Sequence, residues 1–261
     1  MNWPKINIIT PSFNQVKYLS ETIESILNQG YPELEYSIID GGSTDGSVEI
    51  IKKYESRLSY WVSEKDDGQS DAIMKGFARS TGELFAWINS DDVLFPGCLK
   101  KIAAAYVKCG KPDIIHSNVA YIDSKSRIVR FVRIPAQSRF FSCRGVWYAQ
   151  APTVFFKSQL FRNIGGLNAK YHLSMNCYIV VRMTKVGAKV VHVPHYLGGF
   201  RWHEASKTVN YLDRSKSHEN PEAQEICRLH IPNVSMLQRL FWKYILKGYR
   251  TLIMNYLLAY K

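Results

Sequence analysis

ELFAWINSDDVLFPG, residues 83–97, joins a strand pattern to a cluster of polar side chains. The run 84–88 is apolar and aromatic, which is typical of a buried strand, and it ends at Asn89, Ser90, Asp91 and Asp92. Two neighbouring carboxylates repel each other unless water solvates them or a cation binds them. Two interpretations are therefore open for this segment: a solvated turn that caps the next helix, or the edge of a cation site.

The same kind of strand recurs on the N-terminal side of this segment, with helical patterns between the strands. The order is INIIT (6–10), a helix near 16–29, EYSIID (35–40), a helix near 47–54, LSYWV (58–62), a helix near 70–78, and ELFAWI (83–88). This alternation is typical of βαβ units. The sequence therefore predicts an α/β fold with a mainly parallel sheet that is flanked by helices.

The C-terminal half alternates less regularly. It predicts a helix at 99–108, strands at 113–123 and 127–132, a strand at 153–156, helices at 159–163 and 175–186, and a strand at 188–193. From about residue 210 the chain is first charged and polar, and then aromatic and basic. We therefore expect a main domain at 1–209 and a helical appendage at 210–261.

The composition limits the classes of partner and compartment. Lys and Arg number 34 against 22 Asp and Glu, and the resulting charge of +12 favours an anionic partner. The five cysteines are scattered and form no CxxC pair, which argues against a disulfide framework or a structural zinc site and favours a reducing cytoplasm. The first residues predict neither a signal peptide nor an N-terminal membrane anchor.

Ligands of parallel α/β sheets bind beyond the carboxyl ends of the strands, so the residues there are candidates for a site. Asp40 with Gly41 and Gly42 could accept hydrogen bonds from a base or ribose while the glycines let a ligand approach the backbone. The same stretch could instead be a turn in which Ser43, Thr44 or Asp45 caps the next helix. Two acidic strand ends in one sheet favour a nucleotide-diphosphate site, with Asp91 holding a divalent cation.

Six motifs follow one another along residues 5–208: TPSFNQ, YPELEYSIIDGGSTDGS, SEKDDGQSDAIMKGF, TGELFAWINSDD, QAPTVFFKSQLFRNIGGLN and FRWHEASKT. In their order and spacing the chain resembles the bacterial family 2 glycosyltransferases, in the branch that builds surface polysaccharides and O-antigens. The resemblance implies a GT-A fold, which is a Rossmann-like α/β architecture. It also implies Mn²⁺ or Mg²⁺ as the cofactor.

The resemblance implies roles for individual residues. The nucleotide would contact Pro11, Ser12, Asn14, Asp40, Gly42, Asp71 and Ser90. The metal would be bound by Asp91, with Asp92 beside it, and by His203, although His203 could equally be a structural histidine in a loop. Gln150 and Arg201 would contact the acceptor or the diphosphate. The first acid of the usual metal motif is Asn89 in this chain, which still leaves one direct carboxylate ligand.

The chain departs from the family at the position of the general base. The family usually has an acidic pair at the start of the helix after GGLN, whereas this chain has Ser174-Met175-Asn176-Cys177-Tyr178. The amide of Asn176 can orient an acceptor hydroxyl but cannot take its proton. Three explanations are open: the position was altered, another group serves as the base, or the chain binds a donor without efficient transfer.

The C-terminal segment combines basic and aromatic residues. Arg239, Lys243, Lys247 and Arg250 recur at helical spacing, with apolar and aromatic residues on the other face. This pattern predicts either an interfacial helix on an anionic membrane surface or a helix packed on the main domain with a solvated basic face. No nucleic-acid motif accompanies it, so we expect no nucleic-acid partner.

Together these features predict a metal-dependent, inverting hexosyltransferase at the cytoplasmic face of the cell membrane. It would transfer a sugar from a nucleotide-sugar donor, UDP-linked by expectation, to a lipid-linked or growing surface-polysaccharide acceptor. The alternative is a catalytically impaired or non-catalytic nucleotide-sugar-binding protein, because Asn176 stands at the base position. A sugar-phosphate nucleotidyltransferase is disfavoured because TPSFNQ lacks the Gly-rich, basic N-terminal loop of those enzymes.

Overall fold

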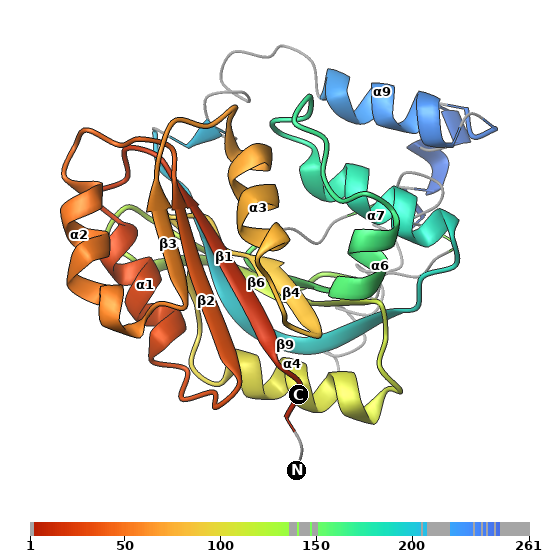
Figure 1. Ribbon diagram of the computed structural model, residues 1–261. Coiled ribbons are helices and arrows are strands. Elements are labelled where there is room, and N and C mark those ends of the chain that lie inside the picture. The colour runs from red at the N-terminus through yellow and green to blue at the C-terminus, as the bar shows by residue number, and fades with distance from the viewer. Residues whose placement is uncertain are drawn as a thin grey trace.

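The computed structural model describes residues 3–135, 140, 147, 151–204, 206–207, 220–231, 233–235, 237–238, 240–242 and 244–245. Within these residues, one sheet of nine strands forms the centre of the molecule (Figure 1). The strands are β1 (Ile6–Ser12), β2 (Leu34–Asp40), β3 (Tyr60–Ser63), β4 (Leu84–Trp87), β5 (Val93–Leu94), β6 (Ile114–Ile122), β7 (Ile128–Val132), β8 (Val154–Lys157) and β9 (Val190–Arg201).

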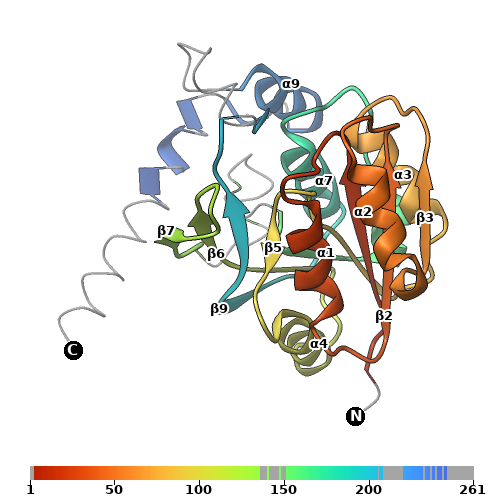
Figure 2. The same ribbon diagram turned by 90° about the vertical axis from the view of Figure 1, so that its left-hand side faces the viewer.

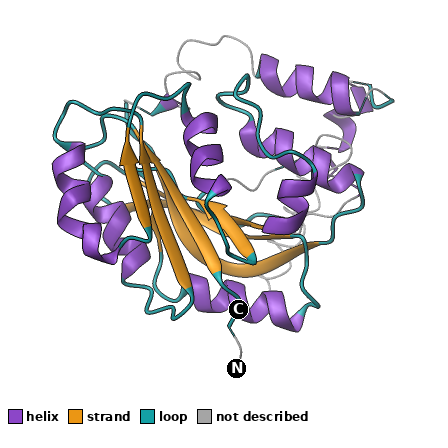
Figure 3. Ribbon diagram, viewed as in Figure 1, coloured by secondary structure: helices purple, strands orange, loops and turns teal. Residues whose placement is uncertain are grey.

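The helices connect these strands in the order that the sequence predicts. They are α1 (Leu19–Leu27), α2 (Ser47–Tyr54), the 3-10 helix η1 (Glu55–Arg57), α3 (Gln69–Ala78), α4 (Cys98–Lys108), α6 (Ser158–Asn163), α7 (Met175–Lys185) and α9 (Pro221–His230). Figure 3 shows helices on both sides of the sheet. The predicted α/β architecture is confirmed.

The sheet has the order β3-β2-β1-β4-β8-β6-β9-β5, and β7 pairs with β6. The first four strands are parallel, and β6 and β9 are parallel to each other. Strand β8 joins the two parallel groups by antiparallel pairing with β4 and β6. The carboxyl ends of β1, β2, β3 and β4 therefore meet at one edge of the sheet, where a ligand site is expected.

Two apolar layers hold the helices against the sheet. Helices α1, α2 and α4 pack on one face through residues such as Ile23, Ile51 and Leu99. Helices α3, α6 and α7 pack on the other face, where Phe85 of β4 contacts the rings of Phe77 and Phe161. Strand β1 is buried along its whole length because both faces are covered. Figure 2, turned by 90°, shows α1 and α2 in front of the parallel strands.

Helix α9 lies against α7 although it belongs to the predicted C-terminal appendage. Val181 of α7 and Cys227 and Ile231 at the end of α9 form a small apolar cluster between them. The division at residue 209 stays a prediction, but α9 packs on the main body of the protein. Within the described residues, the structure contains no helix that is long and apolar enough to cross a membrane.

Strand β9 is longer than the sequence pattern indicates. The predicted strand ends at 193, whereas β9 continues to Arg201 beside β6. Gly198 and Gly199 make this continuation possible, because a Cβ at Gly198 would lie 2.7 Å from Pro152 and one at Gly199 would lie 2.9 Å from Val93. The extension brings the segment after β9 to the carboxyl end of β4. The two-residue strand β5, which pairs with β9, is absent from the sequence-based prediction.

We predict that Phe85→Ala destabilises the fold by about 3–5 kcal/mol, because it leaves a cavity between fully buried rings. Urea unfolding followed by circular dichroism measures this change in the free energy of unfolding. Phe131→Ala is the control, since Phe131 is 57% exposed and should change the free energy by less than about 1 kcal/mol. Equal effects of the two substitutions would contradict the assignment of this core.

Candidate active site

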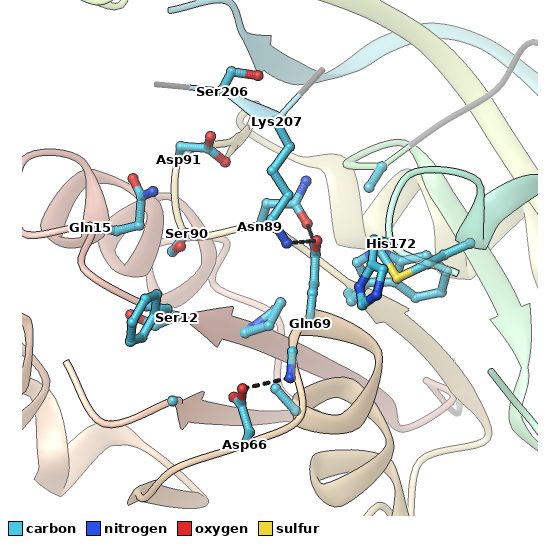
Figure 4. Close-up of a pocket in the computed structure, with 18 of the residues that line it drawn as sticks. Ser12, Gln15, Asp66, Gln69, Asn89, Ser90, Asp91, His172, Ser206 and Lys207 are labelled. Carbon is cyan, nitrogen blue, oxygen red and sulfur yellow. Dashed lines mark hydrogen bonds between the residues drawn. The ribbon is translucent and has the colours of Figure 1, made fainter. Parts of the chain in front are cut away.

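A cavity of about 710 Å³ lies at the carboxyl edge of the parallel strands. Residues from the ends of β1, β2 and β4, from the loop before α3 and from the start of α7 surround it, as Figure 4 shows. Its lining includes Pro11, Ser12, Phe13, Gln15, Gly41, Gly42, Lys65, Asp66, Gln69, Asn89, Ser90, Asp91, His172, Asn176 and Lys207. Figure 4 shows Asp91 and Gln15 on one side of the cavity and His172 on the other.

Asp91 is paired with a histidine at the rim of this cavity. Its Oδ2 lies 2.9 Å from Nε2 of His203, and the two side chains are 19% and 5% exposed. The histidine ring packs on Tyr18, with 4.8 Å between the ring centroids. Sequence motifs more than 100 residues apart therefore supply one carboxylate oxygen and one imidazole nitrogen at the same place.

Arg201, at the end of β9, connects the segment of Asp91 to other parts of the fold. Its guanidinium is buried and donates hydrogen bonds to the carbonyl oxygens of Asp91 and Asp123, to the Ser126 hydroxyl and to the Glu21 carboxylate. All of these contacts are between 2.7 and 3.0 Å. Arg201 therefore does not line the cavity, where the sequence analysis expected it to approach a diphosphate, because its donors serve the protein.

Asp92 also faces the protein and not the cavity. Its Oδ1 accepts the backbone N–H of Arg201, and its Oδ2 accepts the side-chain amide of Asn89. Burial raises the pKa of Asp92 well above its ordinary value, and the neighbouring charge of Asp91 raises it further. Of the adjacent acids Asp91 and Asp92, only Asp91 presents its carboxylate to the cavity.

Asp40 stabilises the loop after β2 by accepting hydrogen bonds from it. It is fully buried and accepts hydrogen bonds from the backbone N–H groups of Gly42 and Ser43 and from the hydroxyls of Ser43 and Ser63. Asp40 was expected to contact the nucleotide, but these four donors occupy its carboxylate. Gly42 lines the cavity above it.

The loop before α3 supplies an acid that the sequence analysis did not select. Asp66 lines the cavity and lies so close to Gly41 that a Cβ there would be 2.8 Å from its Oδ2. Asp71, which was expected to contact the nucleotide, pairs with Lys75 and accepts the N–H of Asp67. Of these two acids, Asp66 lines the cavity and Asp71 does not.

Two polar atoms of the cavity wall have no hydrogen-bond partner within the described residues. They are the hydroxyl oxygen of Ser12 and the side-chain carbonyl oxygen of Asn176. Unpartnered buried polar groups are costly and rare in native proteins. Both residues line the cavity, although these two oxygen atoms are themselves buried.

Lys207 brings a cation to the cavity from the segment after β9. Its Nζ donates to the side-chain oxygen of Gln69, whose amide nitrogen donates to Asn89 (Figure 4). Burial lowers the pKa of Lys207, although the acids Asp66, Asp91 and Glu222 act in the opposite direction. A partly desolvated ammonium beside Asp91 suits an anionic ligand.

Helix α9 anchors the far wall of the cavity. The Glu222 carboxylate accepts the backbone N–H groups of His172, Leu173 and Ser174 at 3.0, 2.9 and 2.9 Å. Asn220 caps the helix by accepting the N–H of Glu222. Because His172, Leu173 and Asn176 line the cavity, the C-terminal segment fixes the shape of the site.

Six of the residues selected from sequence line this cavity: Pro11, Ser12, Gly42, Ser90, Asp91 and Asn176. His203 supports it through Asp91, whereas Asn14 joins the first two loops by accepting the N–H of Thr44. Gln150 lies outside the described residues. Asp66 and Lys207 were not selected from the sequence, although both lie within the motifs SEKDDGQSDAIMKGF and FRWHEASKT. Asp66 belongs to the polar stretch after the strand at 58–62, where the resemblance pointed to Asp71 instead, and Lys207 lies beyond the last predicted strand.

The donors at Asp91 fit a cation that is shared with a phosphate ligand. Within the described residues there is no group of three or more His, Cys, Asp and Glu side chains that could hold a metal alone. Mg²⁺ sites commonly use one or two carboxylates together with substrate phosphates and water, and Mn²⁺ accepts similar ligands. Asp91 and His203 meet this requirement only if a ligand completes the coordination.

Comparison with known proteins agrees with this geometry. The model of the Glycosyl transferase family 2 matches residues 7–165. A glycosyltransferase of Mycobacterium tuberculosis is 29% identical over 199 residues, which cover 70% of each chain. TuaG of Bacillus subtilis, a glycosyltransferase assigned to teichuronic acid biosynthesis, is 37% identical over 95 residues, covering 35% of this chain and 38% of TuaG. The chain spans about two fifths of the length of several of the curated relatives it matches.

Solved structures share the fold. TarS of S. aureus, residues 1–349 in complex with UDP-GlcNAc, aligns with a TM-score of 0.68 at 19% identity, covering 86% of this chain and 65% of that one. The mannosyltransferase PcManGT of Pyrobaculum calidifontis, in complex with GDP-Man and Mn²⁺, aligns with a TM-score of 0.61 at 13% identity, covering 100% and 82%. The predicted GT-A fold is therefore confirmed.

We predict that Glu222→Ala destabilises the protein by about 1–3 kcal/mol, because three backbone N–H groups lose their acceptor. Thermal unfolding monitored by circular dichroism measures the loss. Glu225→Ala, one turn away on α9, removes only an ion pair with the exposed Lys170 and should cost less than about 1 kcal/mol. A smaller effect at Glu222 than at Glu225 would show that the loop does not depend on α9.

Proposed function

Because the chain belongs to glycosyl transferase family 2, we propose that it transfers a hexose from a UDP-linked donor, with inversion, to a lipid-linked or growing polysaccharide acceptor. One observation carries this proposal: a cavity at the carboxyl edge of the sheet contains Asp91 backed by His203, with Lys207 nearby. A carboxylate that can share a cation and a lysine ammonium are the groups that a nucleotide diphosphate requires.

The donor would lie along the ends of β1, β2 and β4. Ser12 and Asp66 line this part of the cavity, and the exposed ring of Phe13 offers a surface for the base. The TarS complex with UDP-GlcNAc supports UDP as the carrier by analogy of fold. PcManGT with GDP-Man shows that this fold also accommodates another nucleotide, so the choice of UDP is part of the proposal.

Asp91 and His203 would hold Mn²⁺ or Mg²⁺ together with the diphosphate. Such a cation, when bound, neutralises the negative charge that develops on the leaving group. Lys207 would add a second positive charge from the segment after β9. The protein fixes Asp91 through its backbone carbonyl, which accepts a hydrogen bond from Arg201.

The acceptor would approach from the wall formed by the start of α7. In an inverting transfer, the acceptor oxygen attacks the anomeric carbon from the face opposite the departing diphosphate, and the acceptor proton must go to a base. Asn176 lines this wall but has no useful basicity. This amide supports a second candidate function, in which the chain binds a nucleotide-sugar and transfers it poorly or not at all.

We further propose that the protein acts on an anionic membrane surface, at the inner face of the cell membrane. Leu237, Phe241, Tyr244 and Ile245 in the C-terminal segment are between 42% and 79% exposed. Basic residues recur in the same segment of the sequence. Exposed apolar side chains beside basic ones favour interfacial binding.

We predict that Asp91→Ala removes the Mn²⁺-dependent part of UDP affinity, because the cation loses its carboxylate ligand. Isothermal titration of UDP with and without Mn²⁺ measures this part directly. Glu49→Ala on the exposed side of α2 is the control and should bind UDP like the unchanged chain. If Mn²⁺ strengthens UDP binding equally in the Asp91→Ala variant, the cation site lies elsewhere.

We predict that Leu237→Asp combined with Phe241→Asp releases the protein from phosphatidylglycerol vesicles, because two exposed apolar anchors become acidic. Vesicle flotation measures binding, and high salt should weaken it for the unchanged chain, since each basic residue near such a surface contributes on the order of 1 kcal/mol. Val107→Asp, at a partly exposed position on α4, is the control. Flotation that neither salt nor the double substitution affects would contradict the membrane proposal.

A further inference from the structure

His172 is a basic side chain on the acceptor wall of the cavity, in the turn that leads into α7. Figure 4 shows it on the side of the cavity opposite Asp91 and Gln15. It lines the cavity together with Leu173, Met175 and Asn176. Within the described residues, neither nitrogen of its ring makes a hydrogen bond, so the imidazole is available to a ligand.

The other titratable groups of the cavity are less suited to receive a proton from an acceptor. Asp91 is engaged with His203, and Asp66 accepts the N–H of Gly68 while lying against Gly41 on the nucleoside side. Lys65 and Lys207 are cations, and a protonated lysine has no acceptor atom. Glu204 is not among the residues that line the cavity.

The position of His172 is fixed from two sides. Glu222 of α9 accepts its backbone N–H at 3.0 Å. The Nδ1 and Cε1 edge of its ring lies against Gly68, where a Cβ would be 3.7 Å from each of these two atoms. Gly68 has a φ of +101°, a conformation that favours glycine, so this loop presents a backbone surface without a side chain to the imidazole.

We propose that His172 is the general base of this chain and replaces the carboxylate that position 176 lacks. The proposal rests on the proposed glycosyl transfer. The acceptor hydroxyl gives its proton to a ring nitrogen of His172 while its oxygen forms the bond to the anomeric carbon. The bond from that carbon to the diphosphate oxygen breaks, and its electron pair leaves with UDP. An unprotonated imidazole is an effective base near neutral pH.

Asn176 then has a separate task on the same wall. Asn176 lines the cavity, and its side-chain amide can hydrogen-bond a second hydroxyl of the acceptor sugar, which orients the reacting one. Two hydrogen-bonding groups on one wall, one basic and one neutral, match two hydroxyl groups of an acceptor. The acceptor class that fits this wall is therefore a sugar with more than one free hydroxyl.

The test uses the full chain and measures two quantities for each variant. Titration of UDP with Mn²⁺ reports donor-site binding, and release of UDP from UDP-GlcNAc and from UDP-glucose, with water as the acceptor, reports proton removal. The variants are His172→Gln, Asn176→Asp, the two combined, and His195→Gln as a matched control at an exposed position on β9 outside the cavity.

We expect His172→Gln to slow UDP release by roughly 10²-fold or more with unchanged affinity for UDP, because a general base contributes about 10²- to 10⁴-fold. Asn176→Asp should speed the reaction and should make it insensitive to His172→Gln, since the carboxylate then serves as the base. His195→Gln should leave both quantities unchanged.

The pH profile separates a base from a structural role. The rate of the unchanged chain should rise with pH, and His172→Gln should abolish this rise. In the combined variant the rise should return at lower pH, because a carboxylate loses its proton at lower pH than an imidazole. The charged groups that face His172, namely Lys65, Asp66, Asp91, Lys207 and Glu222, are the same in all variants.

The proposal is overturned by an unchanged rate and pH profile in His172→Gln, and also by the absence of UDP release from the unchanged chain although it binds UDP. A chain that binds no nucleotide in any variant would instead contradict the proposed function itself. Loss of UDP affinity in His172→Gln would place the histidine in the donor site and would also overturn its role as the base.

Discussion

The candidate site depends on the hydrogen bonds that the buried guanidinium of Arg201 donates. It joins the end of β9 to the carbonyl oxygen of Asp91, to the turn before β7 and to Glu21 of α1, while the Arg201 N–H binds Asp92. A buried cation is stable only when its donors are satisfied, so these elements must assemble together. Their assembly places His203, two residues beyond Arg201, within hydrogen-bond distance of Asp91.

The acidic residues at the carboxyl edge of the sheet fall into two groups with different roles. Asp40 and Asp92 are buried and hold loops and strand ends, whereas Asp66 and Asp91 face the cavity. The difference arises from the available donors: backbone N–H groups and hydroxyls surround the buried acids, and a ligand must satisfy the others. On the far wall, the Glu222 carboxylate likewise accepts a backbone N–H group, from the turn that carries His172.

Most of the fold could be predicted from the sequence, because the spacing of apolar residues and the positions of turn residues determine βαβ units locally. The sequence also located the cavity, since Pro11, Gly42 and Asp91 stand at the ends of predicted strands. Only the family resemblance selected Asp91 over Asp92, because the orientation of the two carboxylates depends on Arg201, more than 100 residues away. The same limit applies to α9, whose Glu222 reaches a loop 48 to 50 residues earlier in the chain. Local pattern does not encode such pairings.

A crystal structure of the full chain with UDP and Mn²⁺ tests the central claim most directly, because it locates the diphosphate relative to Asp91. We expect the cation to contact Asp91 and His203, the diphosphate to lie between them and Lys207, and the uridine to lie near Ser12 and Asp66. A nucleotide bound away from the ends of β1 and β4, or a cation held without Asp91, would contradict the account.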